Sequence, residues 1–244
     1  MTDRALWITW YDLAERDREP YLSWLHGTYI PRQMARPGFL WAAHFASDPE
    51  PVRTAKKKPR RYPRAGTVPG GHGYLLVFGA AHPHVFANPS PRQLHARLSG
   101  ADRDRIALRQ GETSNIMIEE ARIEGPESSR REPGTALSPC IQLGSYVHDD
   151  EDELMAWYAQ WRLPSMQSLP GCIGVRKLVS VAGWAKHAIL HEFTSVEARN
   201  AEFVDHERNR HPEMAEWSER VTGQVVHYPG SPNVARRIWS AVAG

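Results

Sequence analysis

Several features that would identify a function directly are missing from this 244-residue chain. It has only two cysteines, Cys140 and Cys172, which do not suggest a disulfide framework, so a reducing cytoplasm is the expected location. No apolar stretch approaches the length of a membrane span and none follows a basic start, so we expect a soluble, unexported protein without a membrane partner. The formal net charge of +2 is too small to indicate a nucleic-acid partner.

Motifs for nucleotides, hydrolysis and metals are also absent. The Gly-rich stretch at 69–73 precedes a strand-like segment instead of joining a strand to a helix, so it lacks dinucleotide-binding context. There is no Gly-x-Ser-x-Gly elbow. The closest histidine clusters among the twelve histidines, 82–84 and 206–211, lack the spacing of a specific zinc site. We therefore expect no metal and no bound organic cofactor.

What the sequence does contain is one phrase written twice. A tryptophan, a proline seven residues later and a Pro-Gly pair six residues after that occur in two places, 133 residues apart (157 − 24 = 133). The matched positions are Trp24 and Trp157, Pro31 and Pro164, Pro37 and Pro170, Gly38 and Gly171, and also Ile8 and Ile141. An internal repeat fixes the architecture before any local assignment, so we expect two copies of one structural unit.

Both copies have the order β-α-β-β-α-β. The strands are assigned from aromatic and β-branched residues, and the helices from apolar residues at helical spacing, with a kink or restart expected at Pro31. The first copy is predicted as strand 5–11, helix 19–36, strands 39–45 and 72–78, helix 90–110 and strand 114–121. The second is predicted as strand 139–147, helix 152–169, strands 172–181 and 186–193, helix 196–220 and strand 221–228.

This order defines a ferredoxin-like unit, in which two helices cover one face of an antiparallel sheet. The bare face of each sheet would be an apolar patch, so we expect an α+β fold in which the two sheets pack face to face as a pseudo-twofold α/β barrel. The first unit is expected at 1–121, a linker at 122–138, and the second unit with a C-terminal extension at 139–244.

A basic insertion at 47–72 makes the first copy about nineteen residues longer than the second at the same place (133 − 114 = 19). A loop of this length is usually either functional or disordered. One interpretation is a lid or arm that recruits an anionic substrate or a partner subunit, and the other is a solvated excursion.

The repeated phrase resembles the helix-to-strand corner of the dimeric α/β-barrel superfamily, in particular its EthD-like branch. That family has a Trp-Tyr helix, then Glu-His-Ile-Pro, then Pro-Gly-Phe. The first copy has Thr-Tyr-Ile-Pro at 28–31 and Pro-Gly-Phe at 37–39, and the second has Trp-Arg-Leu-Pro at 161–164 and Pro-Gly-Cys at 170–172. The resemblance covers nearly the whole chain and implies a tandem fusion of two units. It also implies a cavity between sheet and helices for a small aromatic ligand.

The family's helix histidine, a favoured catalytic candidate there, is replaced in both copies. Tyr29 stands at its position in the first copy and Arg162 in the second. A tyrosine could move a proton if its pKa were lowered, whereas an arginine can hold an anion but cannot act as a general base. We therefore expect the two copies to differ in role.

Polar residues within apolar strands supply the other candidates. His44 and Lys177 are equivalent (177 − 44 = 133), and alternation puts His187 and His191 on one face of their strand. For each residue the alternative is a hydrogen-bonded core position, and His26 is expected at the surface. The predicted catalytic residues are Tyr29, Arg162, His191, His44 and Lys177, and the predicted substrate-binding residues are Trp24, Trp157, Trp41 and His187.

Three functions remain open. The first is a cofactor-independent enzyme that moves protons on an aromatic or polyketide-like molecule, as a cyclase, isomerase, lyase or oxygenase, and that forms a homo-oligomer. The second is a non-catalytic binding or assembly module whose interior is filled by side chains. The third is a haem protein of the chlorite dismutase-like or dye-decolorising peroxidase-like type, which would need His206 or His211 as an iron ligand.

Overall fold

The computed structural model describes residues 3–50, 59–131 and 136–242. Most of the basic run in the predicted insertion therefore lies outside the described residues. The first half contains β1 (Ala5–Asp12), η1 (Glu15–Asp17), α1 (Arg18–Trp24), η2 (Leu25–Tyr29), α2 (Ile30–Met34), β2 (Phe39–Ser47), β3 (Tyr74–Ala80), η3 (Pro83–Phe86), α3 (Pro91–Ala96), α4 (Gly100–Ile106) and β4 (Gln110–Glu124).

The second half repeats the order of strands and helices after a short turn, η4 (Ser128–Arg130). Its elements are β5 (Cys140–Val147), α5 (Glu151–Trp157), η5 (Tyr158–Arg162), α6 (Leu163–Met166), β6 (Cys172–Ala182), β7 (His187–Phe193), α7 (Val196–Ala198), η6 (Arg199–Phe203), α8 (His206–Arg210), η7 (Pro212–Met214), α9 (Ala215–Gly223), β8 (Val226–His227) and β9 (Asn233–Val242).

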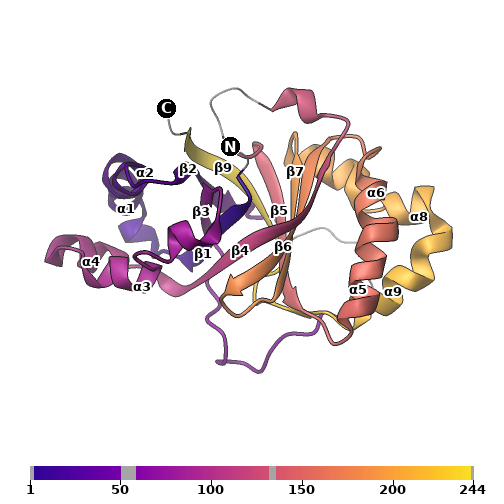
Figure 1. Cartoon of the computed structure of the whole chain (residues 1–244), viewed down its shortest axis with the longest axis horizontal. Coiled ribbons are helices and arrows are strands. Elements are labelled where there is room, and N and C mark those ends of the chain that lie inside the picture. The colour runs from indigo at the N-terminus through magenta and orange to yellow at the C-terminus, as the bar shows by residue number, and fades with distance from the viewer. Residues whose placement is uncertain (1–2, 51–58, 132–135, 243–244) are drawn as a thin grey trace.

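The strands close into an antiparallel barrel, which confirms the predicted fold class. Their order is β7-β6-β4-β1-β3-β2-β9-β5, and β5 pairs back to β7. The two long strands β4 and β9 join the halves, because β4 pairs with β1 and then with β6, while β9 pairs with β5 and with β2. Figure 1 shows β4 crossing the front of the barrel from one half to the other.

Two helical layers cover the outside of the barrel on opposite sides (Figure 1). The inside is filled by apolar side chains of both halves, among them Leu6, Ile8, Ile141 and Leu143. The helices of each half pack on the outer face of their own strands, and these contacts form two further apolar clusters. Trp41 belongs to the cluster inside the barrel, whereas Tyr29, Trp24 and Trp157 belong to the clusters between barrel and helices.

Strand register defines which positions of the two halves are equivalent. In each half the first and second strands pair with the same residue of the third, which is Ala80 in the first half and Phe193 in the second. Ala80 pairs with Ala5 and Phe39, and Phe193 pairs with Cys140 and Cys172. The offsets are 135 (140 − 5), 133 (172 − 39) and 113 (193 − 80) for the three strands.

This register corrects the sequence alignment at the first strand. Ile8 and Ile141 are 133 apart, so they are two residues away from structural equivalence, whereas His44 and Lys177 are equivalent as predicted. The same offsets make three polar pairs equivalent, and these are Tyr11 and Tyr146, His44 and Lys177, and Tyr74 and His187.

The first helix of each half contains a π-helical turn directly after its tryptophan. These turns, Leu25–Tyr29 and Tyr158–Arg162, are again 133 residues apart (158 − 25). Pro31 follows the first of them, in the opening turn of α2, where a missing N–H is tolerated. The predicted break at Pro31 is therefore a change of helical pitch within a continuous helical segment.

Several predicted elements were wrong in their bounds, and the predicted helix 196–220 is divided into α7, η6, α8, η7 and α9. The helix 90–110 is two short helices that start at the serine caps Ser90 and Ser99. Residues 215–223 are helical, so the predicted last strand at 221–228 is reduced to the two residues of β8. The strand that completes the second half is β9, in the region assigned as an extension.

The predicted linker at 122–138 begins inside β4, which runs through Glu124. Among the helices of the described residues, none is both long and apolar enough to span a membrane.

Candidate functional site

The predicted residues fall into three clusters. Tyr29 and His44 lie in the first half, in what we call the tyrosine–histidine cluster. Lys177 and His187 form a lysine cluster in the second half. Arg162 and His191 form an arginine–histidine cluster, also in the second half.

In the tyrosine–histidine cluster, His44 joins two neighbours on opposite sides of its ring. Its Nε2 lies 2.8 Å from the Tyr11 hydroxyl and its Nδ1 lies 2.8 Å from Nε2 of His26. Burial holds the pKa of His44 well below its usual range, so the ring is neutral. A neutral imidazole carries one N–H, so it donates to one neighbour and accepts from the other. His26 is half-buried, not at the surface as predicted.

Tyr29 is 1% exposed and its hydroxyl lies 3.2 Å from Nε2 of His95. Burial raises the pKa of Tyr29, which opposes its use as a base near neutral pH. The nearby cation is Arg109, whose guanidinium carbon lies 5.7 Å from the Tyr29 ring centroid and 4.6 Å from that of Tyr11. Sequence analysis missed Arg109, because it placed this residue at the end of a helix.

Arg109 also holds its surroundings in place. It donates from Nε to the Tyr21 hydroxyl at 2.5 Å and from a terminal nitrogen to Glu112 at 2.9 Å. The region between barrel and helices in the first half is thus filled by tyrosines packed around one guanidinium.

In the lysine cluster, the Lys177 ammonium group lies 3.0 Å from Nδ1 of His187 and 3.0 Å from the Glu120 carboxylate. It also lies 5.3 Å from the Tyr158 ring centroid. The Lys177 side chain is 1% exposed, whereas Glu120 is 35% exposed, so the ammonium group is buried behind a carboxylate that reaches solvent. Burial lowers the pKa of Lys177, and Glu120 partly opposes this shift.

His187 and Tyr158 complete the lysine cluster. Burial and the adjacent Lys177 lower the pKa of His187 to about 4, so the ring is neutral. Its Nε2 faces the half-exposed Glu151 at 3.5 Å. The Tyr146 hydroxyl donates to the Tyr158 hydroxyl at 2.7 Å. Because Tyr158 accepts this bond, its own O–H remains available to donate.

In the arginine–histidine cluster, Arg162 and His206 are bonded to each other. Nδ1 of His206 lies 2.9 Å from the Phe203 carbonyl, which can only accept, so Nδ1 carries the hydrogen. Its Nε2 therefore accepts from Arg162 at 3.0 Å. Burial and Arg162 lower the pKa of His206 to about 3. His191 is 2% exposed, and neither of its ring nitrogens has a hydrogen-bond partner among the described residues.

Sequence analysis grouped His191 with Tyr29, Arg162 or Lys177, and the structure brings together only part of this set. Arg162 is among the charges that lower the pKa of His191, so these two are neighbours. Lys177 pairs with Ile189 in the sheet, two residues along β7 from His191. Tyr29 belongs to the other half.

The predicted substrate-binding tryptophans are bonded to the protein itself. Trp24 donates to Asp102 at 2.9 Å, Trp157 to Ser218 at 3.0 Å and Trp41 to Asp3 at 2.8 Å. These bonds support the structural interpretation of all three indoles.

Two cavities of the described residues lie away from these clusters. One, of about 360 Å³, lies between α2 and the α3–α4 region, and the other, of about 340 Å³, lies beside the start of β5. Their linings are Arg32, Gln33, Arg36, Leu94, Arg97, Leu98, Ser99 and Asp102, and Arg130, Pro139, Ile173 and Thr194. Neither lining contains a predicted site residue.

His206, one of the two expected iron ligands, does not fit a haem iron. Both nitrogens of His206 are engaged, and its Nε2 faces the guanidinium group of Arg162. His211 lies edge-on against Trp161 and pairs with Glu213. The rings of Phe193 and Phe203 pack against His191, and neither of the two cavities adjoins it. The described residues also hold no group of three or more metal-ligating side chains.

No family model and no curated protein matches the chain. Solved structures do match over its whole length. An anthrone oxidase-like protein has a TM-score of 0.59 and 12% identity over 100% of this chain and 94% of its own. A proposed monooxygenase from Lactobacillus acidophilus has a TM-score of 0.52 and 16% identity over 100% and 98%. A proposed chlorite dismutase has a TM-score of 0.54 and 12% identity over 98% and 96%.

At these identities the likeness shows the fold alone. The fold is that of the ferredoxin-like dimeric α+β barrels, which agrees with the fold that the sequence resemblance implied. The EthD-like branch stays a prediction.

Proposed function

We propose that the chain is a cofactor-independent enzyme that transfers protons on a small aromatic or polyketide-like molecule, and that the lysine cluster is its reacting site. The observation that carries this proposal is the Lys177 ammonium group, buried between His187 and Tyr158 and linked to solvent through Glu120. Strongly perturbed titratable groups of this kind concentrate at functional sites.

The chemistry follows from the two perturbed groups. The lowered pKa of Lys177 increases the fraction of neutral amine, which can take a proton from an acidic C–H or phenol. The pKa of Tyr158 is raised to about 12, so the phenol keeps its proton and can donate a hydrogen bond to the oxyanion that forms. The proton on Lys177 then leaves through the Glu120 carboxylate, which is 35% exposed.

The direct test is turnover of compounds with an acidic C–H, beginning with anthrone. Anthrone loses its central proton to give a stabilised carbanion, which O₂ oxidises to anthraquinone and water. We expect Lys177→Met to lower kcat/KM by at least about 100-fold, the usual effect of losing a general base. Quinone formation and O₂ uptake measure the rate.

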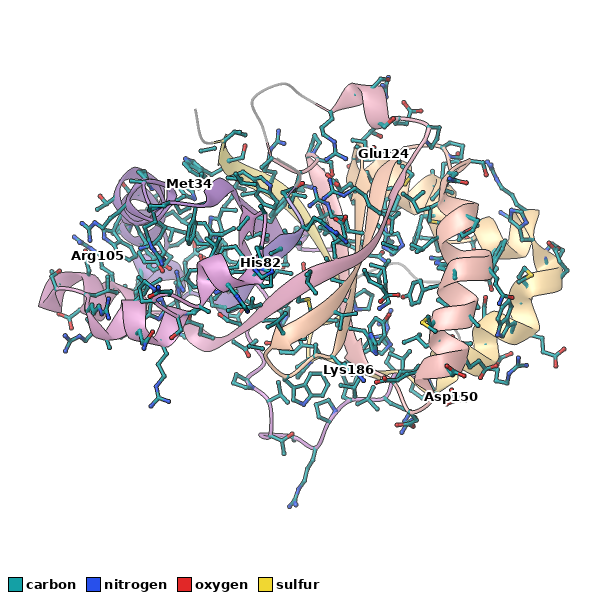
Figure 2. The ribbon with its side chains drawn as sticks, in the orientation of Figure 1. Met34, His82, Arg105, Glu124, Asp150 and Lys186 are labelled. Atoms are coloured by element: carbon teal, nitrogen blue, oxygen red, sulfur yellow. The ribbon has the colours of Figure 1, made fainter. Side chains whose placement is uncertain are left out.

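Lys186→Met is the matched control. Lys186 lies nine residues along the chain from Lys177 and pairs with Glu151 on the surface (186 − 177 = 9). Figure 2 places its side chain beside Asp150, at the edge of the second half. Lys186 lowers the pKa of Lys177 only through its charge, so we expect this variant to keep turnover within a few-fold of wild type. Equal losses in the two lysine variants would contradict a catalytic role of Lys177.

One observation favours the second candidate function, a non-catalytic binding or assembly module. Tyr29, His44, Lys177 and His191 are each at most 2% exposed, and neither of the two cavities named above is lined by any of them. Saturable binding of an aromatic ligand, without turnover of anthrone or other compounds with an acidic C–H, would support this alternative.

We further propose that the two halves arose by duplication and tandem fusion of one EthD-like unit. The repeated phrase and the π-helical turn at the same offset of 133 support this origin. Homologues with a histidine at position 29 or 162 would support it, whereas homologues that lack the phrase in one half would count against it.

A further inference from the structure

The arginine–histidine cluster contains a buried imidazole whose ring nitrogens have no hydrogen-bond partner among the described residues. Arg162 is half-buried, and its hydrogen bond goes to the neutral His206. Among the described residues, no carboxylate lies within ion-pair distance of Arg162. A second guanidinium, Arg199, is 2% exposed and is engaged by the protein, because two of its nitrogens donate to the side-chain oxygen of Gln142 and a third donates to that of Asn200 at 2.7 Å.

Both cations lie close enough to His191 to lower its pKa, and neither of its ring nitrogens has a hydrogen-bond partner in the described part of the chain. The Gln142 backbone opposes this shift in pKa, but it does not meet the geometry of a hydrogen bond to the ring. Buried polar groups are nearly always paired, so an unpaired one in a native fold indicates a missing partner. Next to two guanidinium groups, the partner that fits is an anion that accepts hydrogen bonds.

Aromatic rings enclose this group of donors. The Phe203 ring centroid lies 4.8 Å from both the Arg162 guanidinium carbon and the His191 ring centroid. Trp157 lies on the other side of Arg162, at 5.9 Å. A ligand that combines a carboxylate with an aromatic ring matches both the charge and the walls.

We infer that Arg162 and His191 form a binding subsite for the carboxylate of an aromatic acid. This inference rests on the proposed function in one respect, since it assigns a carboxylate to the substrate of the lysine cluster. His187 and His191 lie on the same face of β7, four residues apart, which is about 13 Å along a strand. A substrate that reaches both clusters is therefore longer than a single ring, and benzoate can occupy the carboxylate subsite alone.

The chain that covers the subsite is irregular. It consists of α7, which continues directly into the π-helical turn η6, and of the five-residue helix α8. Helices this short are not stable by themselves, so the cover depends on side chains such as Phe203 that pack beneath it. The second π-helical turn, η5, ends at Arg162, which places an irregular helix on each side of the subsite.

The test is direct binding of sodium benzoate to the full chain by calorimetry, with benzamide as the uncharged analogue of the same shape. We expect saturable benzoate binding, and at least about tenfold weaker binding of benzamide. Arg162→Gln should weaken benzoate binding at least about tenfold, and Arg162→Lys, which keeps the charge, should weaken it less.

Two control variants separate this subsite from other basic surfaces and from catalysis. Arg32→Gln removes a cation from the larger of the two cavities and should leave benzoate binding unchanged. Lys177→Met should also leave it unchanged even though it abolishes turnover. The inference is overturned if benzoate does not saturate, if benzamide binds equally well, or if Arg32→Gln weakens binding as much as Arg162→Gln.

His191→Leu gives a second readout that does not depend on any ligand. Replacing an unsatisfied buried imidazole by an apolar side chain removes a desolvation cost, so the ligand-free variant should have a higher Tm than wild type. Its benzoate affinity should fall. A lower Tm would mean that His191 is a satisfied structural residue, and the subsite would then lose its central observation.

Discussion

At the scale of single residues, His44 and Lys177 occupy equivalent positions but have opposite surroundings. His44 lies among tyrosines and a second histidine, and it is neutral because burial and the nearby cations disfavour its charge. Lys177 faces two acidic residues, Glu120 and Glu151, which partly offset its burial. Of these two residues, Lys177 is therefore the one that we expect to gain and lose a proton during turnover.

This difference predicts a pH effect for Glu120→Gln. The Glu120 carboxylate raises the pKa of Lys177, so its removal should lower that pKa further. If the neutral amine is the base, activity rises with pH through this pKa, and the acid limb of the kcat/KM profile should move to lower pH. Glu153→Gln, a variant of a carboxylate bonded to Arg220, is the control and should not shift the limb. A shift toward higher pH would rule out Lys177 as the base.

At the scale of elements, the repeated phrase was enough to predict the corner between helix and second strand. It fixed the offset between Trp24 and Trp157. The π-helical turns that follow these two residues could not be predicted, because they depend on tertiary contacts. The sequence alignment of the first strands is wrong by two residues. Their true register is defined only by pairing with the third strands, at Ala80 in the first half and Phe193 in the second. Strand β9 was missed because its pairing partners, β5 and β2, come from both halves.

For the site, the sequence predicted only which polar residues share one face of a strand. Alternation placed His187 and His191 on one face of their strand, but nothing in the sequence separated the lysine cluster from the arginine–histidine cluster. Arg109 was missed because a basic residue at a helix end usually lies in solvent, whereas here burial places it among Tyr11, Tyr21 and Tyr29.

The Pro-Gly corner gives a prediction at this scale. Gly38 has φ +87°, and a Cβ there would lie 2.8 Å from a methyl group of Val85. Gly38→Ala should therefore destabilise the fold by about 1–3 kcal/mol, from backbone strain and a steric clash. Gly27, in the first π-helical turn, has open space where a Cβ would lie, with no neighbouring atom within 4 Å, so Gly27→Ala is the control and should be neutral or stabilising. Urea unfolding measures both, and equal effects would contradict the argument.

At the scale of the whole molecule, β4 and β9 make each half incomplete without the other. Each strand pairs with one half along part of its length and with the other half along the rest, so the barrel closes only when both halves are folded. If either helical layer opens, it exposes barrel strands that also pair with strands of the other half. We therefore expect the two halves to unfold together.

Acid unfolding tests this coupling, because both halves contain buried neutral histidines. The pKa is lowered to about 4 for His187 and to about 3 for His206, and burial lowers it well below the usual range for His44 and His191. For such groups the unfolded chain binds more protons than the folded one, so stability is full above the unfolded pKa of 6.5 and falls as pH decreases toward the folded pKa.

We expect the free energy of unfolding to decrease steadily from pH 7 to pH 4, and to do so in one transition seen equally by tryptophan fluorescence and far-UV circular dichroism. His44→Gln removes one proton-uptake site in the first half, so it should make the decrease less steep while leaving a single transition. Two separate transitions would show that β4 and β9 do not couple the halves. A free energy that stays constant over this range would show that these histidines are not held neutral by the fold.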